Sequence, residues 1–172
     1  INTSGKQWEI SEDGKVLIQP LSSIKGLGDK AIKQITNHRP FGEIEDLLFN
    51  PEITYSKLNK KALNVLCLSG ALNHLIDDRF TGLKHFWAAV VDDRPKNNKK
   101  FKEHVEIYEE MGDFTKAERI SQISSLTGIF PFDLVMDENI VENLEKYLVP
   151  PLGSWDSDLG VAWFVPREVV RK

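Results

Sequence analysis

The residues best suited to chemistry form a short glycine-rich stretch in which Gly26 and Gly28 flank Leu27. Glycine permits a tight turn and leaves no Cβ between the backbone and an approaching group. The pattern predicts a helix, a Gly-Leu-Gly hairpin and a second helix, whose free N–H groups at Gly28, Asp29 and Lys30 point outward. Such a helix start attracts anions, and a phosphate of a nucleic-acid backbone is a fitting ligand.

Charged side chains around this hairpin have opposing effects on an anion. Lys25 and Lys30 add positive charge, whereas Asp29 partly opposes a phosphate. Two alternatives remain open. The hairpin can be a purely structural tight turn, or Gly26-x-Gly28-x-x-Ala31 can be a dinucleotide-binding fingerprint, which requires a buried strand leading directly into the first glycine.

Composition limits the classes of protein that the chain can be. The 172 residues have a formal net charge of −4, 41% of them are hydrophobic, and Cys67 is the single cysteine. A strongly basic nucleic-acid binder, a disulfide framework and a zinc finger are therefore excluded. No apolar run is long enough to suggest a membrane span. The net charge is +2 in residues 1–40 and −4 in residues 121–172, so the mild positive excess coincides with the glycine hairpin.

The elements that must position the hairpin are mainly helical. Asp13-Gly14 between two short apolar runs predicts an N-terminal β-hairpin closed by a two-residue turn. Apolar residues at helical spacing predict a helix starting at Ser22 before the glycines, and another after them that ends near Pro40. The same periodicity predicts further helices over 43–49, 60–69, 80–91, 101–111, 114–126 and 137–148, with Asn59 and Asp137 as N-caps. The helix over 60–69 is apolar all round and is expected to be buried, and the helix over 137–148 is expected to turn an apolar face inward, made of Ile140, Val141, Leu144 and Leu148. Gly160–Val165 is predicted to be a strand without a partner, which suggests a fragment of a longer protein.

The glycine stretch resembles the helix-hairpin-helix motif, which binds DNA backbones without sequence specificity. A longer series of motifs resembles the alpha subunit of bacterial DNA polymerase III, a C-family replicative polymerase, in the region after its palm and fingers. The resemblance covers about residues 1–75. It rests on Asn2 and Ser4, Asp13-Gly14, Ser23–Gly28, Arg39–Gly42, Glu45–Leu48, Asn59–Leu63 and Ser69–Leu72.

This resemblance implies a division of the chain into three parts. Residues 1–76 hold the β-hairpin and a tandem helix-hairpin-helix region, in which the second, degenerate hairpin lies at Ser69-Gly70-Ala71. Residues 77–149 form a helical region. Residues 150–172 comprise a linker and the truncated first strand of a following OB-like domain. The implied fold is a mainly α helix-hairpin-helix bundle with a short N-terminal β-hairpin and a stray C-terminal strand.

The function implied is binding to the phosphate backbone of duplex DNA in a replicative polymerase. The family's catalytic aspartates lie in the palm, so we expect a non-catalytic stretch of a DNA-directed DNA polymerase, without metal or cofactor, in the cytoplasm at the nucleoid. The resemblance admits the sliding clamp or other replisome proteins as further partners. The alternative is a helical protein–protein interaction module with a structural hairpin. The predicted DNA-binding residues are Lys25, Gly26, Leu27, Gly28, Asp29, Lys30, Ser69, Gly70 and Ala71.

Overall fold

The computed structural model describes residues 1–136, 138–156, 158 and 160–164. The chain divides into two compact units, Ile1–Ile129 and Phe130–Lys172. The fold is mainly α, as predicted, and the sheet that the described residues contain is one antiparallel pair of strands. None of the described helices is long and apolar enough to cross a membrane.

The N-terminal β-hairpin is present, with a longer loop than predicted. Strands β1 (Glu9–Ile10) and β2 (Leu17–Ile18) pair in the register Glu9 to Ile18 and Ile10 to Leu17. Asp13-Gly14 does not form a two-residue turn, because the loop is closed by a bond from the Ser11 N–H to the Val16 carbonyl. The hairpin is largely exposed and adds little to the core.

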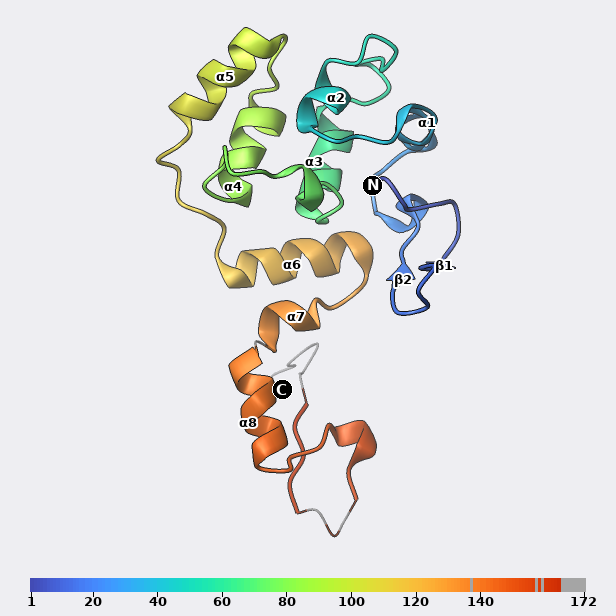
Figure 1. The fold of residues 1–172 in the computed structure, drawn as a ribbon, viewed down its shortest axis with the longest axis vertical. Helices are drawn as coiled ribbons and strands as arrows, with labels where there is room; N and C mark the ends of the chain where they lie inside the picture. Colours follow the sequence, from blue (N-terminus) through green and yellow to red (C-terminus); the bar gives the residue numbers. More distant parts are fainter. Residues whose placement is uncertain (137, 157, 159, 165–172) are drawn as a thin grey trace, which may run out of the picture. The chain divides into compact units, whose positions relative to one another are not determined.

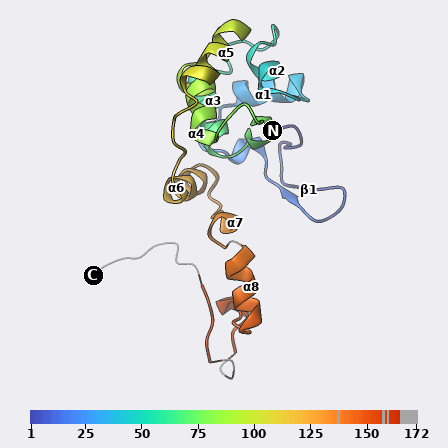
Figure 2. The same cartoon turned by 60° about the vertical axis from the view of Figure 1, so that its left-hand side comes forward.

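The helices of the first unit include α3, which packs against the π-helix that continues α4 and against α6 (Figure 1, Figure 2). Their bounds are α1 Asp29–His38, α2 Ile44–Leu48, α3 Lys60–Leu68, α4 Leu83–Phe86, a π-helix Trp87–Asp92, α5 Asn98–Ile107 and α6 Lys116–Thr127, with 3-10 turns at Leu21–Ser23 and Asn73–Leu75. The all-round apolar character predicted for α3 is confirmed, because Leu63, Leu66 and Cys67 are fully buried.

A single hydrophobic core holds this unit together. It combines residues before position 76, such as Ile35 and Leu63, with residues after it, such as Phe86 and Phe101. The division after residue 76, which follows the extent of the resemblance, stays a prediction about function. In the structure, residues on both sides of position 76 contribute to one hydrophobic core. Burial of apolar surface in such a core is the main source of folding free energy.

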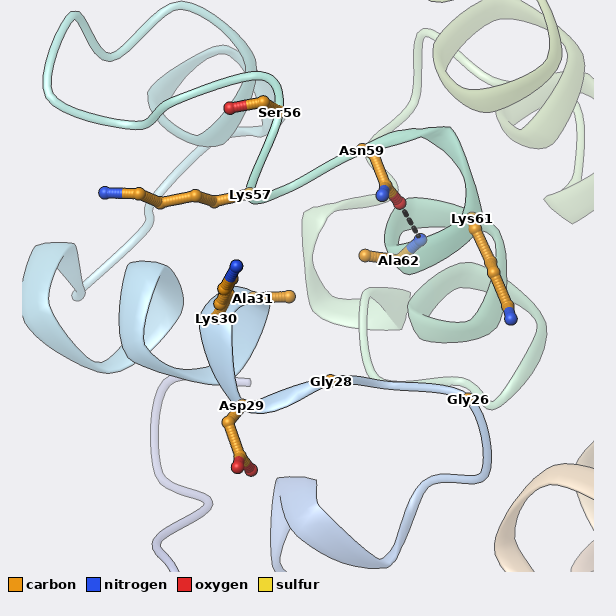
Figure 3. Close-up of a pocket in the computed structure, with 10 residues that line it drawn as sticks. All are labelled: Gly26, Gly28, Asp29, Lys30, Ala31, Ser56, Lys57, Asn59, Lys61 and Ala62. Atoms are coloured by element: carbon orange, nitrogen blue, oxygen red, sulfur yellow. Dashed lines mark hydrogen bonds between the residues drawn. The ribbon is translucent and has the colours of Figure 1, made fainter.

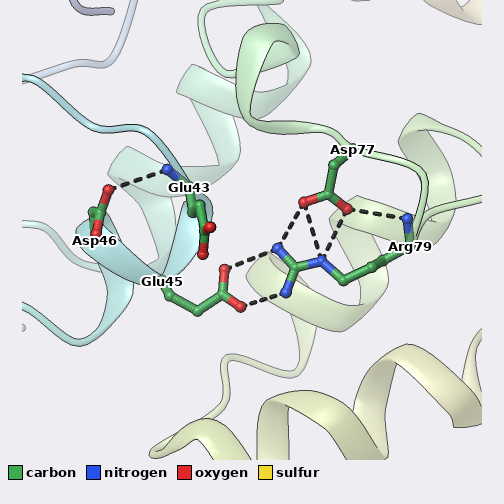
Figure 4. Close-up of polar contacts among 5 residues, drawn as sticks. All are labelled: Glu43, Glu45, Asp46, Asp77 and Arg79. Carbon is green, nitrogen blue, oxygen red and sulfur yellow. Dashed lines mark hydrogen bonds and ion pairs between the residues drawn. The ribbon is translucent and has the colours of Figure 1, made fainter.

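A charged network also joins the two sides of residue 76 (Figure 4). The guanidinium of Arg79 binds both carboxylate oxygens of Glu45 on α2 and both of Asp77. Hydrogen bonds from Arg79 hold the pKa of Asp77 below its usual value of 3.8. Arg79 also lies 5.2 Å from the ring centre of Phe101, so it links α2, the loop before α4 and α5.

The second unit contains α7 (Phe132–Val135), α8 (Glu138–Lys146) and a 3-10 turn at Leu152–Ser154. The inward apolar face predicted for α8 is wrong: Ile140 and Val141 are 40% and 38% exposed, because the elements described in this unit are too few to cover them. Its predicted cap, Asp137, lies outside the described residues.

At the predicted C-terminal strand, Trp163 forms an isolated parallel bridge with Pro151. Val165, the last residue of the predicted strand, lies outside the described residues.

Candidate nucleic-acid interface

The first glycine hairpin turns sharply at Gly26, whose φ is +86°. Only a residue without Cβ adopts this conformation easily. Leu27 is buried, and its N–H donates to the Ile24 carbonyl across the turn. The segment before the turn is a single 3-10 turn at Leu21–Ser23, and the predicted preceding helix is wrong because the backbone at Ile24 is already extended, with φ −74° and ψ 115°.

Gly28 is the N-cap of α1 and leaves the start of that helix open. Its φ of −84° and ψ of 156° are angles that any residue adopts. A Cβ at Gly28 would meet no atom within 4 Å, so neither backbone strain nor packing requires glycine here. The Gly28 carbonyl accepts hydrogen bonds from the N–H groups of Ala31 and Ile32. The N–H groups of Asp29 and Lys30 precede these bonds and therefore have no acceptor within the helix.

A hollow of about 440 Å³ opens beside this helix start (Figure 3). One wall is the hairpin and the first turn of α1, and the other is the chain leading into α3. The two walls are in contact, because a Cβ on Gly26 would lie 3.5 Å from Val65 Cγ1 and 3.8 Å from Lys61 Cε. The lining residues are Gly26, Gly28, Asp29, Lys30, Ala31, Ser56, Lys57, Asn59, Lys61 and Ala62.

The hollow is cationic. Lys30, Lys57 and Lys61 line it, and no ion pair is formed by them within the described part of the chain. Asp29 is the acidic lining residue, and its carboxylate points away from Asn59 and Ala62 (Figure 3). The hollow therefore combines free positive charge with exposed backbone N–H groups, a combination suited to anions.

The structure brings together only part of the predicted site. Gly26, Gly28, Asp29 and Lys30 line the hollow, whereas Leu27 is buried in the hydrophobic core. Lys25 does not line the hollow; its side chain is exposed and its N–H donates to the Leu126 carbonyl at 2.8 Å. A DNA-binding role for any of these residues stays a prediction.

The second hairpin is a separate feature. Gly70 has the same φ, +86°, as Gly26, but Ser69, Gly70 and Ala71 line a different hollow, of about 190 Å³. The element that follows is a 3-10 turn, Asn73–Leu75, so no α-helix starts there. The second hairpin thus shares the glycine turn of the first and lacks its helix start.

Sequence reasoning missed Lys57 and Lys61 as parts of the site. Asn59 between them was predicted as an N-cap, which is confirmed: its side-chain oxygen accepts a bond from the Ala62 N–H at 3.0 Å. No local sequence pattern marks these two lysines as site residues, because they line the hollow only when the start of α3 packs against Gly26.

Two other sets of residues do not form sites in the part of the chain described. The dinucleotide alternative does not fit, because Gly26 follows a 3-10 turn and no parallel strand leads into it. Asp156 and Asp158, whose Asp-x-Asp spacing was overlooked in the sequence, form a local turn in which the Asp158 N–H donates to the Asp156 carboxylate at 3.2 Å.

Comparison with known proteins agrees with this geometry. Residues 1–82 match the profile of a protein family described as "Helix-hairpin-helix motif". The predicted resemblance to the helix-hairpin-helix motif is therefore confirmed in the first half of the chain, whereas the tandem arrangement over residues 1–76 stays a prediction.

Two relatives extend the comparison. The chain is 33% identical over 76 residues to the DNA polymerase III subunit alpha of Pseudomonas fluorescens, which covers 44% of this chain and 6% of that protein. It is 29% identical over 92 residues to the subunit of the same name from Pseudomonas aeruginosa, covering 52% of this chain and 8% of that protein. The predicted resemblance is confirmed, and the chain spans less than a tenth of either relative. No solved structure matches.

Proposed function

We propose that the first unit binds the phosphate backbone of duplex DNA, without sequence specificity, as part of the alpha subunit of a replicative DNA polymerase. The observation that carries the proposal is the open start of α1. Gly28 leaves the backbone at this helix start uncovered by a side chain, although neither packing nor backbone strain requires a glycine at this position. A helix N-terminus with nearby lysines stabilises one phosphate without touching a base.

The net charge of −4 is consistent with weak binding of this kind. Backbone N–H groups and a few lysines supply the local field, and the contacts carry no base information because phosphates are the same in every sequence. Polymerase activity belongs, in this proposal, to parts of a longer protein that contain the catalytic aspartates. The sliding clamp stays a predicted partner.

A titration of random-sequence duplex DNA at low salt tests the proposal, with Gly28→Asp as the variant. Aspartate is a better N-cap than glycine, so the fold should be retained. Its carboxylate would occupy the open helix start and repel phosphate, and we expect affinity to fall roughly tenfold at about 50 mM salt.

The matched control is Gly112→Asp. A Cβ at Gly112 also meets no atom within 4 Å, and the substitution changes the net charge equally. We expect the affinity of this control to stay within about twofold of the unaltered chain. If the unaltered chain does not bind at low salt, or the two variants bind equally, the hairpin is structural and the interaction-module alternative is favoured.

A further inference from the structure

The wall of the hollow opposite the hairpin is formed by residues outside the glycine motif. Residues 56–62 lead into the first turn of α3 and contribute Lys57 and Lys61. This wall is held firmly: Leu58 is fully buried, its carbonyl accepts a bond from Arg94, and Asn59 caps the helix. The two lysines therefore extend from a fixed backbone.

Neighbouring lysines in this wall differ in their pairing. Lys60 donates to the carboxylate of Asp92 at 2.6 Å and to its carbonyl at 2.9 Å, and it does not line the hollow. Lys57 and Lys61 line the hollow, and no ion pair is formed by either within the described residues. Positive charge is thus supplied to the hollow by Lys61, in the first turn of α3, and by Lys57, in the chain that leads into it.

We propose that Lys57 and Lys61 bind further phosphates of the same duplex that the Gly26–Gly28 hairpin contacts. The inference rests on the proposed function and extends its footprint across the hollow to α3. The lining contains no aromatic side chain on which a base could stack, and its cationic groups come from both walls. A run of backbone phosphates matches this arrangement better than a nucleotide held by its base.

The salt dependence of duplex binding measures the number of phosphates that are neutralised. The slope of log K against log salt changes by about 0.9 for each contact, which is about a 3.5-fold change in affinity between 50 and 200 mM salt. We expect Lys57→Gln and Lys61→Gln each to reduce the magnitude of the slope by about 1, and the double variant by about 2.

Lys60→Gln is the control, since it removes the same charge one residue away. We expect its slope to equal that of the unaltered chain. If the double variant and the control have equal slopes while Gly28→Asp still weakens binding, this inference is wrong and the proposed function stands. If the unaltered chain does not bind duplex DNA, both fail together.

Discussion

Asn2 and Phe41 exchange two hydrogen bonds. The Phe41 N–H donates to Asn2 Oδ1 at 2.9 Å, and Asn2 Nδ2 donates to the Phe41 carbonyl at 2.7 Å. Phe41 is 1% exposed, so its peptide groups have little access to water. Asn2→Ala leaves both groups without this partner, and we expect the free energy of unfolding to fall by about 1–3 kcal/mol.

Urea denaturation measures this change. Asn98→Ala, in the exposed first turn of α5, is the control and should change stability by less than about 0.5 kcal/mol. Equal stability of the Asn2 and Asn98 variants would show that the paired hydrogen bonds do not stabilise the fold.

Asn59 begins α3 by accepting the Ala62 N–H. Asn59→Ala removes this cap, and we expect a loss of about 1 kcal/mol in the free energy of unfolding. Asn59→Ser retains a capping oxygen and should recover most of the loss. Thermal unfolding of the two variants tests this, and a serine variant as unstable as the alanine variant contradicts a capping role.

Asp77 makes stability depend on acidity. Its pKa is lowered by the hydrogen bonds from Arg79, so the folded state favours the ionised form. This contribution is complete above the ordinary pKa of 3.8 and is lost as the pH falls through the lower folded value. We expect Asp77→Asn to flatten the decline of stability below about pH 4.

Asp78→Asn provides the matched control for that experiment. Asp78 is the adjacent carboxylate, and no ion pair or hydrogen bond is formed by its side chain within the described residues. Urea unfolding at several pH values should give the Asp78 variant the acid profile of the unaltered chain. An Asp77 variant with the same profile would refute the role of the Arg79 pair.

Cys67 should be chemically inert in the folded protein. Burial raises the pKa of its thiol to about 12, and the side chain is fully buried in α3. Because the thiolate is the reactive form, we expect no alkylation by iodoacetamide at pH 8 and complete alkylation in guanidinium chloride. Mass spectrometry distinguishes the two states, and rapid labelling without denaturant would contradict the burial of α3.

Much of the fold could be predicted from local patterns. Asn59 and the apolar residues after it specify α3, and Gly128 ends α6 in the left-handed conformation typical of a helix C-terminus. The π-helix at Trp87–Asp92 could not be predicted, because its bond from Asp93 N–H to the Ala88 carbonyl has no local sequence signal. The short helix α7 was missed for the same reason.

Only part of the candidate site could be predicted. Gly26 and Gly28 indicate the hairpin in the sequence, because a sharp turn and an open helix start both favour glycine. Lys57 and Lys61 lack such a signal, since lysine is common on exposed helix surfaces. Their importance depends on the packing of α3 against the hairpin, which involves residues distant in sequence.

The core shared across position 76 sets a lower limit on the piece of this protein that can be studied alone. A chain ending at residue 76 would lose Phe86, Val90 and Phe101 from the core and would expose the surface of α3 that packs against the π-helix. It would also lose Leu126, whose carbonyl fixes the Lys25 N–H beside the first hairpin. Residues 1–75, whose motifs resemble those of the polymerases, therefore share their core with residues 77–129, and we expect them not to fold alone.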